Sequence, residues 1–512
     1  MKKIFIIAVC ALAPASVSAE QWQVLGTRPM GMGGAFVAIA QGPIAQYWNP
    51  AGLVKSSANV SGVEIPVGVN AEFTGDIVKN ASQITAMSKE FSAIQAAQKG
   101  GSKADANEIG AFVKTLALMG DMNKPGKGAL AEVAGGVDFK FSKVAISVNN
   151  FTSIGLNPEI DVKNIGLNTI AGTPGSGITL SASNGTPGNP GDAAAAAKIA
   201  GAISAADFAN IAKLICGAAT CPNVANQTQL ANALINQAVL NNVTKADITA
   251  AANEIAANIS AASPIIAAAA TGHPYTDNTS ALNIVGASFT EIAAGYAWNV
   301  DKWLSGLSIG GNVKMINGQT ISNSFQFLSE SKTGDAFKLD NPKSSWRPAL
   351  DLGALWDVNA KYPKAPLHPK VGLVIRNINS PSFDTNSGPK YNLDRQARMG
   401  FALNPAKFWT LAMDMDLTKN KTPVKGFDSR ELSMGTEINI VNRKAFNIPL
   451  RAGLIKNIAE KSSKMAYTVG TGLNLLFMHF DVSGLVSSQK TKLDDKNIPT
   501  KLGVAASFGL LF

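Results

Sequence analysis

Charged residues are scarce in this chain. Asp, Glu, Lys and Arg make up 16% of its 512 residues, against about 25% in an ordinary soluble protein. Long apolar runs are missing too: after residue 19 every stretch of helical membrane-spanning length has polar interruptions, which argues against a transmembrane helix. No Lys/Arg-rich run stands out, so the formal net charge of +10 does not predict nucleic acid binding.

Residues that bind metals or carry out nucleophilic chemistry are few. The three histidines (His273, His368 and His479) lie far apart in the sequence, so we predict no metal site. No Ser/His/Asp, Cys/His or phosphate-loop spacing is visible, and we predict neither a catalytic site nor a cofactor. An enzyme assembled from distant residues stays open. Dispersed acids such as Asp351, Asp414 and Asp416 are better explained as groups that line an interior or a rim.

The first nineteen residues carry the pattern of an export signal. Lys2 and Lys3 precede a short apolar run, and Val17-Ser18-Ala19 supplies a small-residue cleavage site. We predict a signal peptide over 1–19, cleaved before the following glutamate.

Cys216 and Cys221 are the only cysteines after the predicted signal peptide. In an exported chain a pair this close predicts a disulfide.

The stretch 502–512 alternates strictly between two faces. One face carries Leu502, Val504, Ala506, Phe508, Leu510 and Phe512, and the other carries mostly small residues. This pattern predicts a strand long enough to cross a bilayer at a tilt. It resembles the closing strand of bacterial outer-membrane barrels, where Phe508, Leu510 and Phe512 would be the signal read by the assembly machinery. The alternative is an edge strand of a soluble sandwich.

Similar alternation recurs along the chain and predicts about fourteen strands, an even number as in bacterial single-chain barrels. Their ranges are 59–78, 133–141, 144–148, 282–298, 303–316, 346–358, 368–379, 396–404, 408–418, 429–441, 448–458, 465–475, 477–488 and 500–512. Connections are alternately short and long, as expected for periplasmic turns and outer loops. Residues 359–367 are the one longer inner turn.

Five tryptophans cluster near the ends of the predicted strands: Trp298, Trp303, Trp346, Trp356 and Trp409. They favour an aromatic girdle at a membrane interface; the alternative is ordinary core packing.

Two segments break the strand pattern. Residues 79–127 and 190–265 show helical spacing, and the second is rich in alanine, the best helix former. Both would emerge on the outer face of a barrel whose first strand runs outward. We therefore predict α-helical extracellular insertions at these positions, with surfaces that could contact a partner protein.

A glycine-dense segment precedes the first strand. It reads Gly-Met-Gly-Gly-Ala-Phe-Val-Ala from residue 31, followed by Tyr-Trp-Asn-Pro-Ala-Gly-Leu from residue 47. This segment resembles the N-terminal hatch of the FadL-type outer-membrane transport superfamily, and the helix-bearing layout is most similar to its TraF-type plasmid-transfer members. The large Ala-rich insertion departs from the FadL pattern. The matching hatch residues are Gly31, Gly33, Gly34, Asn49, Pro50 and Ala51.

The resemblance implies an all-β transmembrane barrel over 57–512 with a luminal hatch at 20–56, located in the Gram-negative outer membrane. The expected partners are outer-membrane lipid and the barrel assembly machinery. Two functions stay open. The protein would either pass small hydrophobic molecules through a gate formed by the hatch, or act as a docking component of a conjugal-transfer or secretion-like apparatus without transport.

Overall fold

Fourteen antiparallel strands close into a barrel in the computed structural model. The structure describes residues 20–54, 61–75, 77–78, 122, 125–161, 190–209, 225–240, 245–257, 279–326, 343–385, 390–443, 446–493 and 496–512. In ring order the strands are β1 (Gly62–Thr74), β2 (Gly128–Phe141), β3 (Val144–Glu159), β4 (Ala281–Asn299), β5 (Leu307–Gln326), β6 (Lys343–Asp357), β7 (Lys370–Arg376), β10 (Gln396–Ala406), β11 (Trp409–Asp416), β14 (Glu431–Arg443), β15 (Phe446–Asn457), β16 (Ala466–Leu475), β17 (Met478–Ser487) and β20 (Lys501–Leu511).

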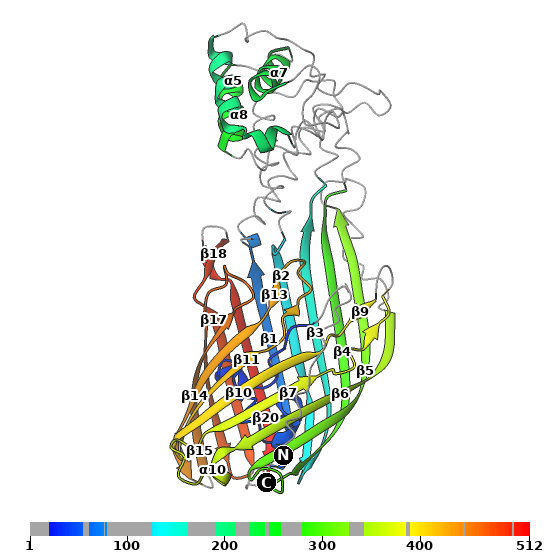
Figure 1. The fold of residues 1–512 in the computed structure, drawn as a ribbon, viewed down its shortest axis with the longest axis vertical. Helices are drawn as coiled ribbons and strands as arrows, with labels where there is room; N and C mark the ends of the chain where they lie inside the picture. Colours follow the sequence, from blue (N-terminus) through cyan, green and yellow to red (C-terminus); the bar gives the residue numbers. More distant parts are fainter. Residues whose placement is uncertain are drawn as a thin grey trace, which may run out of the picture.

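The ring closes because the first and last strands pair. β1 bonds to β2 on one side and to β20 on the other, with Val69 opposite Val504 in the second ladder. Each remaining strand of the ring pairs with the ring strands that precede and follow it in the chain, and the small hairpins are excluded from the ring (Figure 1). Closure gives each of the fourteen strands a hydrogen-bonded neighbour on both sides. The ladder between β6 and β7 is short and covers only Leu352–Asp357 of β6. The predicted closed barrel and its number of strands are therefore confirmed.

Side chains alternate between an apolar outer face and a polar or small inner face. On β20 the outward residues Leu502, Val504 and Phe508 are 44%, 58% and 43% exposed, whereas Ala505 and Ser507 between them are buried. The same alternation places Asp138 and Lys140 of β2 inside and Phe139 outside. A strand requires this separation of faces, because successive side chains point to opposite sides of the sheet.

The strand boundaries differ from prediction mainly in β3 and β5. β5 extends ten residues beyond the predicted end, through 317–326, and pairs with β4 along its whole length. This extension reads Asn-Gly-Gln-Thr-Ile-Ser-Asn-Ser-Phe-Gln. Polar residues fall on both faces there, so local alternation carries no signal and only the neighbouring strand defines it.

The two ends of the barrel differ in their connections. At one end, here called the inner end, β2 joins β3 through residues 142–143 and β10 joins β11 through 407–408. The longest inner connection, 358–369, begins with the short helix α10 (Val358–Lys361). The opposite, outer end carries three small hairpins: β8 (Ser382–Phe383) with β9 (Tyr391–Asn392), β12 (Asn420–Lys421) with β13 (Asp428–Ser429), and β18 (Lys490–Leu493) with β19 (Lys496–Pro499).

Helices lie beyond the outer end (Figure 1). They are α5 (Pro190–Ala202), α7 (Gln227–Leu240) and α8 (Lys245–Ala257), and all three fall within the predicted insertion at 190–265. The Ser204 hydroxyl accepts a hydrogen bond from the Asp207 amide at 3.1 Å, as an N-cap does. Most of the predicted insertion at 79–127 lies outside the described residues. Within the described residues, no helix combines the length and apolar character needed to cross a membrane.

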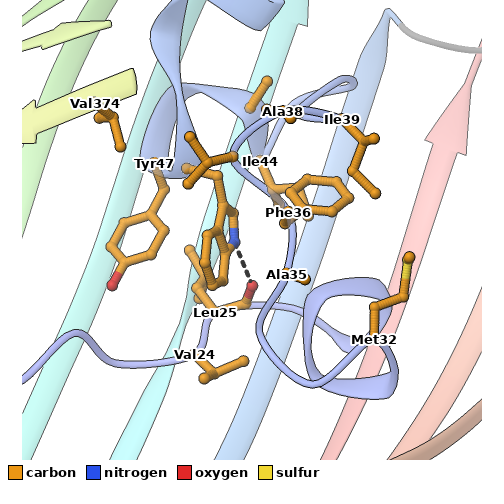
Figure 2. Packing of buried hydrophobic residues seen from close by; sticks show 14 of the residues in the cluster. Val24, Leu25, Met32, Ala35, Phe36, Ala38, Ile39, Ile44, Tyr47 and Val374 are labelled. Carbon is orange, nitrogen blue, oxygen red and sulfur yellow. Dashed lines mark hydrogen bonds between the residues drawn. The ribbon is translucent and has the colours of Figure 1, made fainter. Parts of the chain in front are cut away.

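The largest hydrophobic core belongs to the N-terminal segment. Here the name "N-terminal segment" means residues 20–54, which include α1 (Thr27–Gly31), α2 (Ala45–Trp48) and the 3-10 helix η1 (Pro50–Val54). Its buried side chains pack on one another (Figure 2). They also pack on small wall residues such as Ala134, Ala402 and Ala505. Because those alanines come from strands around the ring, the wall surrounds the segment.

Candidate functional site

An aromatic cluster forms the centre of the N-terminal segment. The Trp48 ring lies 5.6 Å from Tyr47, 5.9 Å from Phe36 and 6.0 Å from Trp22, measured between centroids. The Trp48 indole N–H donates to the Leu25 carbonyl at 2.9 Å, shown as the dashed line in Figure 2. These rings supply a compact apolar body. The Tyr47 hydroxyl donates to the Gln23 carbonyl at 2.6 Å within the segment, whereas the buried Trp22 indole N–H has no hydrogen-bond partner within the described residues.

Two wall arginines lie against this cluster. The Arg376 guanidinium carbon, on β7, is 4.0 Å from the Tyr47 ring centroid, and that of Arg398, on β10, is 4.7 Å from the Trp22 ring. Each guanidinium also pairs with a wall acid: Arg376 with Glu291 at 2.9 Å and Arg398 with Asp416 at 2.6 Å. Buried cations with both a carboxylate and an aromatic face are well compensated.

Asn49 uses both ends of its amide. Its side-chain N–H groups donate to the carbonyls of Val37 at 3.1 Å and of Ala354, on β6, at 3.0 Å. Its carbonyl oxygen accepts from the Ala51 amide at 3.1 Å. The residue is fully buried. A single asparagine thus joins two parts of the segment to the wall, and truncating it would leave several buried polar groups without partners.

The glycines of the segment touch the wall directly. Gly33 has φ +66°, and a Cβ at this position would lie 2.7 Å from the carbonyl oxygens of Met434 and Leu454. Gly34, at φ +82°, faces the Ser433 hydroxyl, and a Cβ on Gly31 would lie 3.2 Å from the Gly470 Cα. Gly33 therefore satisfies two demands at once: a left-handed backbone and contact with two ladder carbonyls.

Glycines of the wall also lie where the wall approaches the N-terminal segment. Added Cβ atoms on nine inward-facing wall glycines would meet the N-terminal segment: Gly68, Gly295, Gly310, Gly353, Gly372, Gly400, Gly435, Gly453 and Gly470. Six of them form directly opposite pairs: Gly310 with Gly353, Gly372 with Gly400, and Gly435 with Gly453. Glycine within a strand can mark a place where another backbone approaches closely. The wall glycines are not among the hatch residues predicted from the sequence, although glycines within the predicted strands were a signal for them.

A chain of ion pairs links the segment to the wall near the inner end. Arg28 binds both oxygens of Glu437 at 2.8 and 2.7 Å. The Glu437 carboxylate also accepts from Arg451 at 2.7 Å, and Arg451 bonds Asp481 at 2.6 Å. His479 follows, with its Nε2 atom 3.9 Å from Asp481. From Arg28 to Asp481 the chain alternates in charge, so each of these ions has an opposite neighbour.

Asp414 holds the turn after the glycines. One oxygen of this buried β11 carboxylate accepts from the Phe36 amide at 2.7 Å and from the Val37 amide at 2.8 Å. Across the barrel, the Thr27 hydroxyl lies 3.0 Å from that of Ser507 on β20. Asp351 and Asp416 are also buried. The acids that the sequence assigned to an interior or a rim therefore face inward.

Glu20 begins the described chain and is buried. Its carboxylate accepts from the Ser153 hydroxyl and the Tyr391 hydroxyl, both at 2.9 Å, and from the Gln23 amide at 3.1 Å. Burial raises the pKa of this carboxyl above its ordinary value, and the three donors offset part of the rise.

An outer loop crosses the mouth above the segment. The β12–β13 hairpin leaves the wall between β11 and β14, and its Pro423 carbonyl accepts from Asn157, on β3, at 2.8 Å. Val424 and Phe427 pack on Leu130 of β2. Because β2 and β11 stand seven places apart in the ring of fourteen, the hairpin reaches the opposite wall. The described part of the outer mouth is therefore bridged.

Three hollows lie around this arrangement. A polar cavity of about 340 Å³ adjoins the inner turns and the Arg28 chain of ion pairs. A second, of about 230 Å³, lies at the outer mouth beside Phe427. The third and largest, about 730 Å³, is an apolar groove on the outer wall across β10 to β16, with Phe401 and Val469 among its lining. It lies on the far side of the wall from the ion pairs.

The remaining predicted site residues fall as follows. Phe508 and Phe512 are exposed on the outer face and Leu510 is half-buried, while their role in assembly stays a prediction. Cys216 and Cys221 lie outside the described residues. No group of three or more His, Cys, Asp or Glu that could hold a metal occurs among the residues that the structure describes.

Four of the five tryptophans named above (Trp298, Trp303, Trp356 and Trp409) lie at or beside inner connections. Trp346 is near the start of β6 at the outer end. Trp298, Trp303, Trp346 and Trp409 are exposed and Trp356 is half-buried. Their surfaces are therefore not part of a shared core.

A closed barrel with an apolar outer wall, a polar inner wall and a buried N-terminal segment is the class that these observations define. The chain belongs to the family described as "F plasmid transfer operon, TraF, protein", whose family model matches residues 46–416. No curated protein matches the chain.

Solved structures with a similar outline include two barrels. The toluene transporter TodX of Pseudomonas putida has 9% identity and a TM-score of 0.41, with 97% of this chain and 100% of that one covered. A Pseudomonas aeruginosa FadL homologue has 8% identity and a TM-score of 0.39, with 97% and 99% covered. Similarity at this level does not relate functions.

Proposed function

We propose that the protein is an outer-membrane barrel in which the N-terminal segment is a plug that gates the passage of small hydrophobic molecules. The observation that carries the proposal is the complementarity between Gly33 and the wall glycines such as Gly435 and Gly453. The wall has glycine at the positions where the segment approaches it, so the shape of its inner face matches that segment. The exposed apolar outer face supports a bilayer as its surroundings, and the short inner turns support a periplasmic inner end.

Passage requires movement of the segment. Beside Tyr47, Phe151 and Phe289 the interior leaves a void of only about 20 Å³, which is about enough for one water molecule. Its lining combines these three rings with charged and amide groups such as Glu291, Arg376 and Gln396, and its volume is too small for a hydrophobic guest. The segment, or the loops above it, must shift before a small hydrophobic molecule can enter, and this is what makes the segment a gate.

A disulfide lock tests the gate. Thr27 and Ser507 have hydroxyl oxygens 3.0 Å apart, so Thr27→Cys with Ser507→Cys, in a Cys216→Ser, Cys221→Ser background, should join segment and wall when oxidised. Intact cells carrying this variant should take up the hydrophobic dye N-phenyl-1-naphthylamine slowly under oxidising conditions and at the wild-type rate after reduction. Thr27→Cys alone is the matched control. Equal uptake by the locked and reduced protein would refute gating by this segment.

Planar bilayers give a second readout of the same proposal. The intact chain should conduct little, and deletion of residues 26–53 should open a stable pore. Equal conductance, with both proteins folded, would place the barrier elsewhere.

The family match favours a second candidate, a docking component of a transfer apparatus. Removing the helices in 190–265 separates the two functions. A transporter should keep its dye uptake without them, whereas a docking component would lose the transfer or secretion phenotype that depends on the intact chain.

A further inference from the structure

The inner end of the barrel carries an excess of cations. The basic residues in or beside the inner connections are Lys143, Lys302, Lys361, Lys364, Lys370, Lys407 and Arg443. None of the seven forms an ion pair with another residue that the structure describes. The two acids there, Asp301 and Asp357, accept hydrogen bonds from nearby backbone amides at 2.8 and 3.2 Å. This group of seven is called the inner collar below.

Two members of the inner collar line the polar cavity of about 340 Å³. Lys370 begins β7, on which Gly372, Val374 and Arg376 are inward and buried at every second position, so Lys370 shares the inward face. Lys407 lies in the turn between β10 and β11. Both cations therefore border the interior of the ring, whereas lipid headgroups would lie outside it.

The cavity also contains buried polar atoms that lack partners. His479 is 8% exposed, and its Nδ1 atom has no hydrogen-bond partner within the described part of the chain. Asn447 also lines the cavity, and its side-chain amide oxygen has no hydrogen-bond partner among the described residues. Buried polar groups normally find partners, and one left alone costs about 1–3 kcal/mol. Together with the volume, which lies within the range of about 300–1,000 Å³ for ligand sites, they indicate a place for a polar guest.

We propose that the inner mouth is a docking site for an acidic peptide segment of a soluble partner, seated in the polar cavity and along the inner collar. Charge complementarity selects the partner, because the collar places unpaired cations on several turns. In the cavity itself the carboxylates of Glu437 and Asp481 are paired with arginines, and Glu64 lies beside His479. Lys370 and Lys407 are the cations of the cavity left without an ion pair among the described residues. A small anion would contact only one or two of these cations, whereas an extended acidic segment reaches many. Carboxylates entering the cavity also come beside Arg28, which is 21% exposed at its side chain. The partner would thus touch the N-terminal segment itself.

The test uses the full chain in nanodiscs of phosphatidylcholine, which has no net charge, and a fluorescein-labelled octaglutamate peptide followed by anisotropy. The peptide should bind at low ionic strength and weaken as salt rises, while a labelled octalysine peptide should not bind. Lys370→Glu with Lys407→Glu should weaken binding about tenfold or more. The matched control is Lys490→Glu with Lys496→Glu, two exposed lysines of the outer β18–β19 hairpin, which should bind as the wild type does.

The following outcomes would overturn the docking proposal or identify another occupant. Absence of binding, or equal weakening by the inner and outer pairs, overturns the proposal. If the double reversal fails to fold, Lys370→Gln with Lys407→Gln should still weaken binding, and unchanged binding by that variant overturns the proposal as well. If nanodiscs with anionic phosphatidylglycerol block the peptide at the collar, lipid headgroups are the true occupant. The readout is independent of dye uptake, so this proposal and the gate can fail separately.

Discussion

The contact of Gly33 with the wall allows a quantitative test of how rigidly the N-terminal segment is held. Gly33→Ala adds one methyl group. A left-handed backbone costs a non-glycine residue about 1–2 kcal/mol, and overpacking adds about 1–3 kcal/mol. The methyl would meet the carbonyl oxygens of Met434 and Leu454 at 2.7 Å. Both oxygens belong to strands that are paired on two sides. Moving either oxygen away would therefore disturb the hydrogen-bonded ladders.

Gly42 provides the matched control. It has φ +75°, and a Cβ there would have nothing within 4 Å. Gly42→Ala therefore carries the backbone cost without the contact. Relative to Gly42→Ala, Gly33→Ala should destabilise the seated segment by about 1–3 kcal/mol, or about 5–150-fold in the population of the released segment at 1.4 kcal/mol per factor of ten.

Hydrogen exchange measured by mass spectrometry reports this population. Peptides covering 26–54 should lose protection by about that factor in Gly33→Ala relative to Gly42→Ala, while strand peptides remain protected in both. Equal protection in the two variants would refute the reasoning, because it would mean that the segment yields to the added methyl at no cost. Heat modifiability on gels would first show that both barrels are folded.

Further predictions concern other parts of the chain. Asp414→Ala should leave two buried amides unpaired at about 1–3 kcal/mol each and lower protection of the same peptides, whereas Asp414→Asn should lower it less. Deleting Phe512 should reduce folded barrel in outer-membrane fractions; an unchanged yield would remove its role as assembly signal. Cys216 and Cys221 should resist thiol labelling on intact cells, and labelling without reductant would exclude their disulfide. The raised pKa of Glu20 favours its neutral form in the seated segment, so seating should weaken as pH rises above the ordinary value of 4.5. Glu20→Gln should abolish that slope in hydrogen exchange.

Most of the architecture could be predicted from local patterns in the sequence. Alternation along 502–512 was enough to predict a strand and its outward face, and repetition of that pattern gave the number of strands. The reason is physical: a strand in a barrel must have one apolar face and one polar or small face. This requirement produces an alternating pattern within the sequence of each strand. Where a strand lacks alternation, as in 317–326 of β5, the sequence could not define its end.

The way the N-terminal segment is held was decided by the tertiary structure. Thr27 meets Ser507, which is 480 positions away in the chain, and Asp414 binds the turn at Phe36 across 378 positions. No periodicity links residues so distant, because their proximity depends on the barrel's closure and on where the segment comes to rest within it. The sequence by itself determined a wall with two faces and a glycine-rich segment before it; only the closed ring determined which glycines of the wall meet which glycines of the segment.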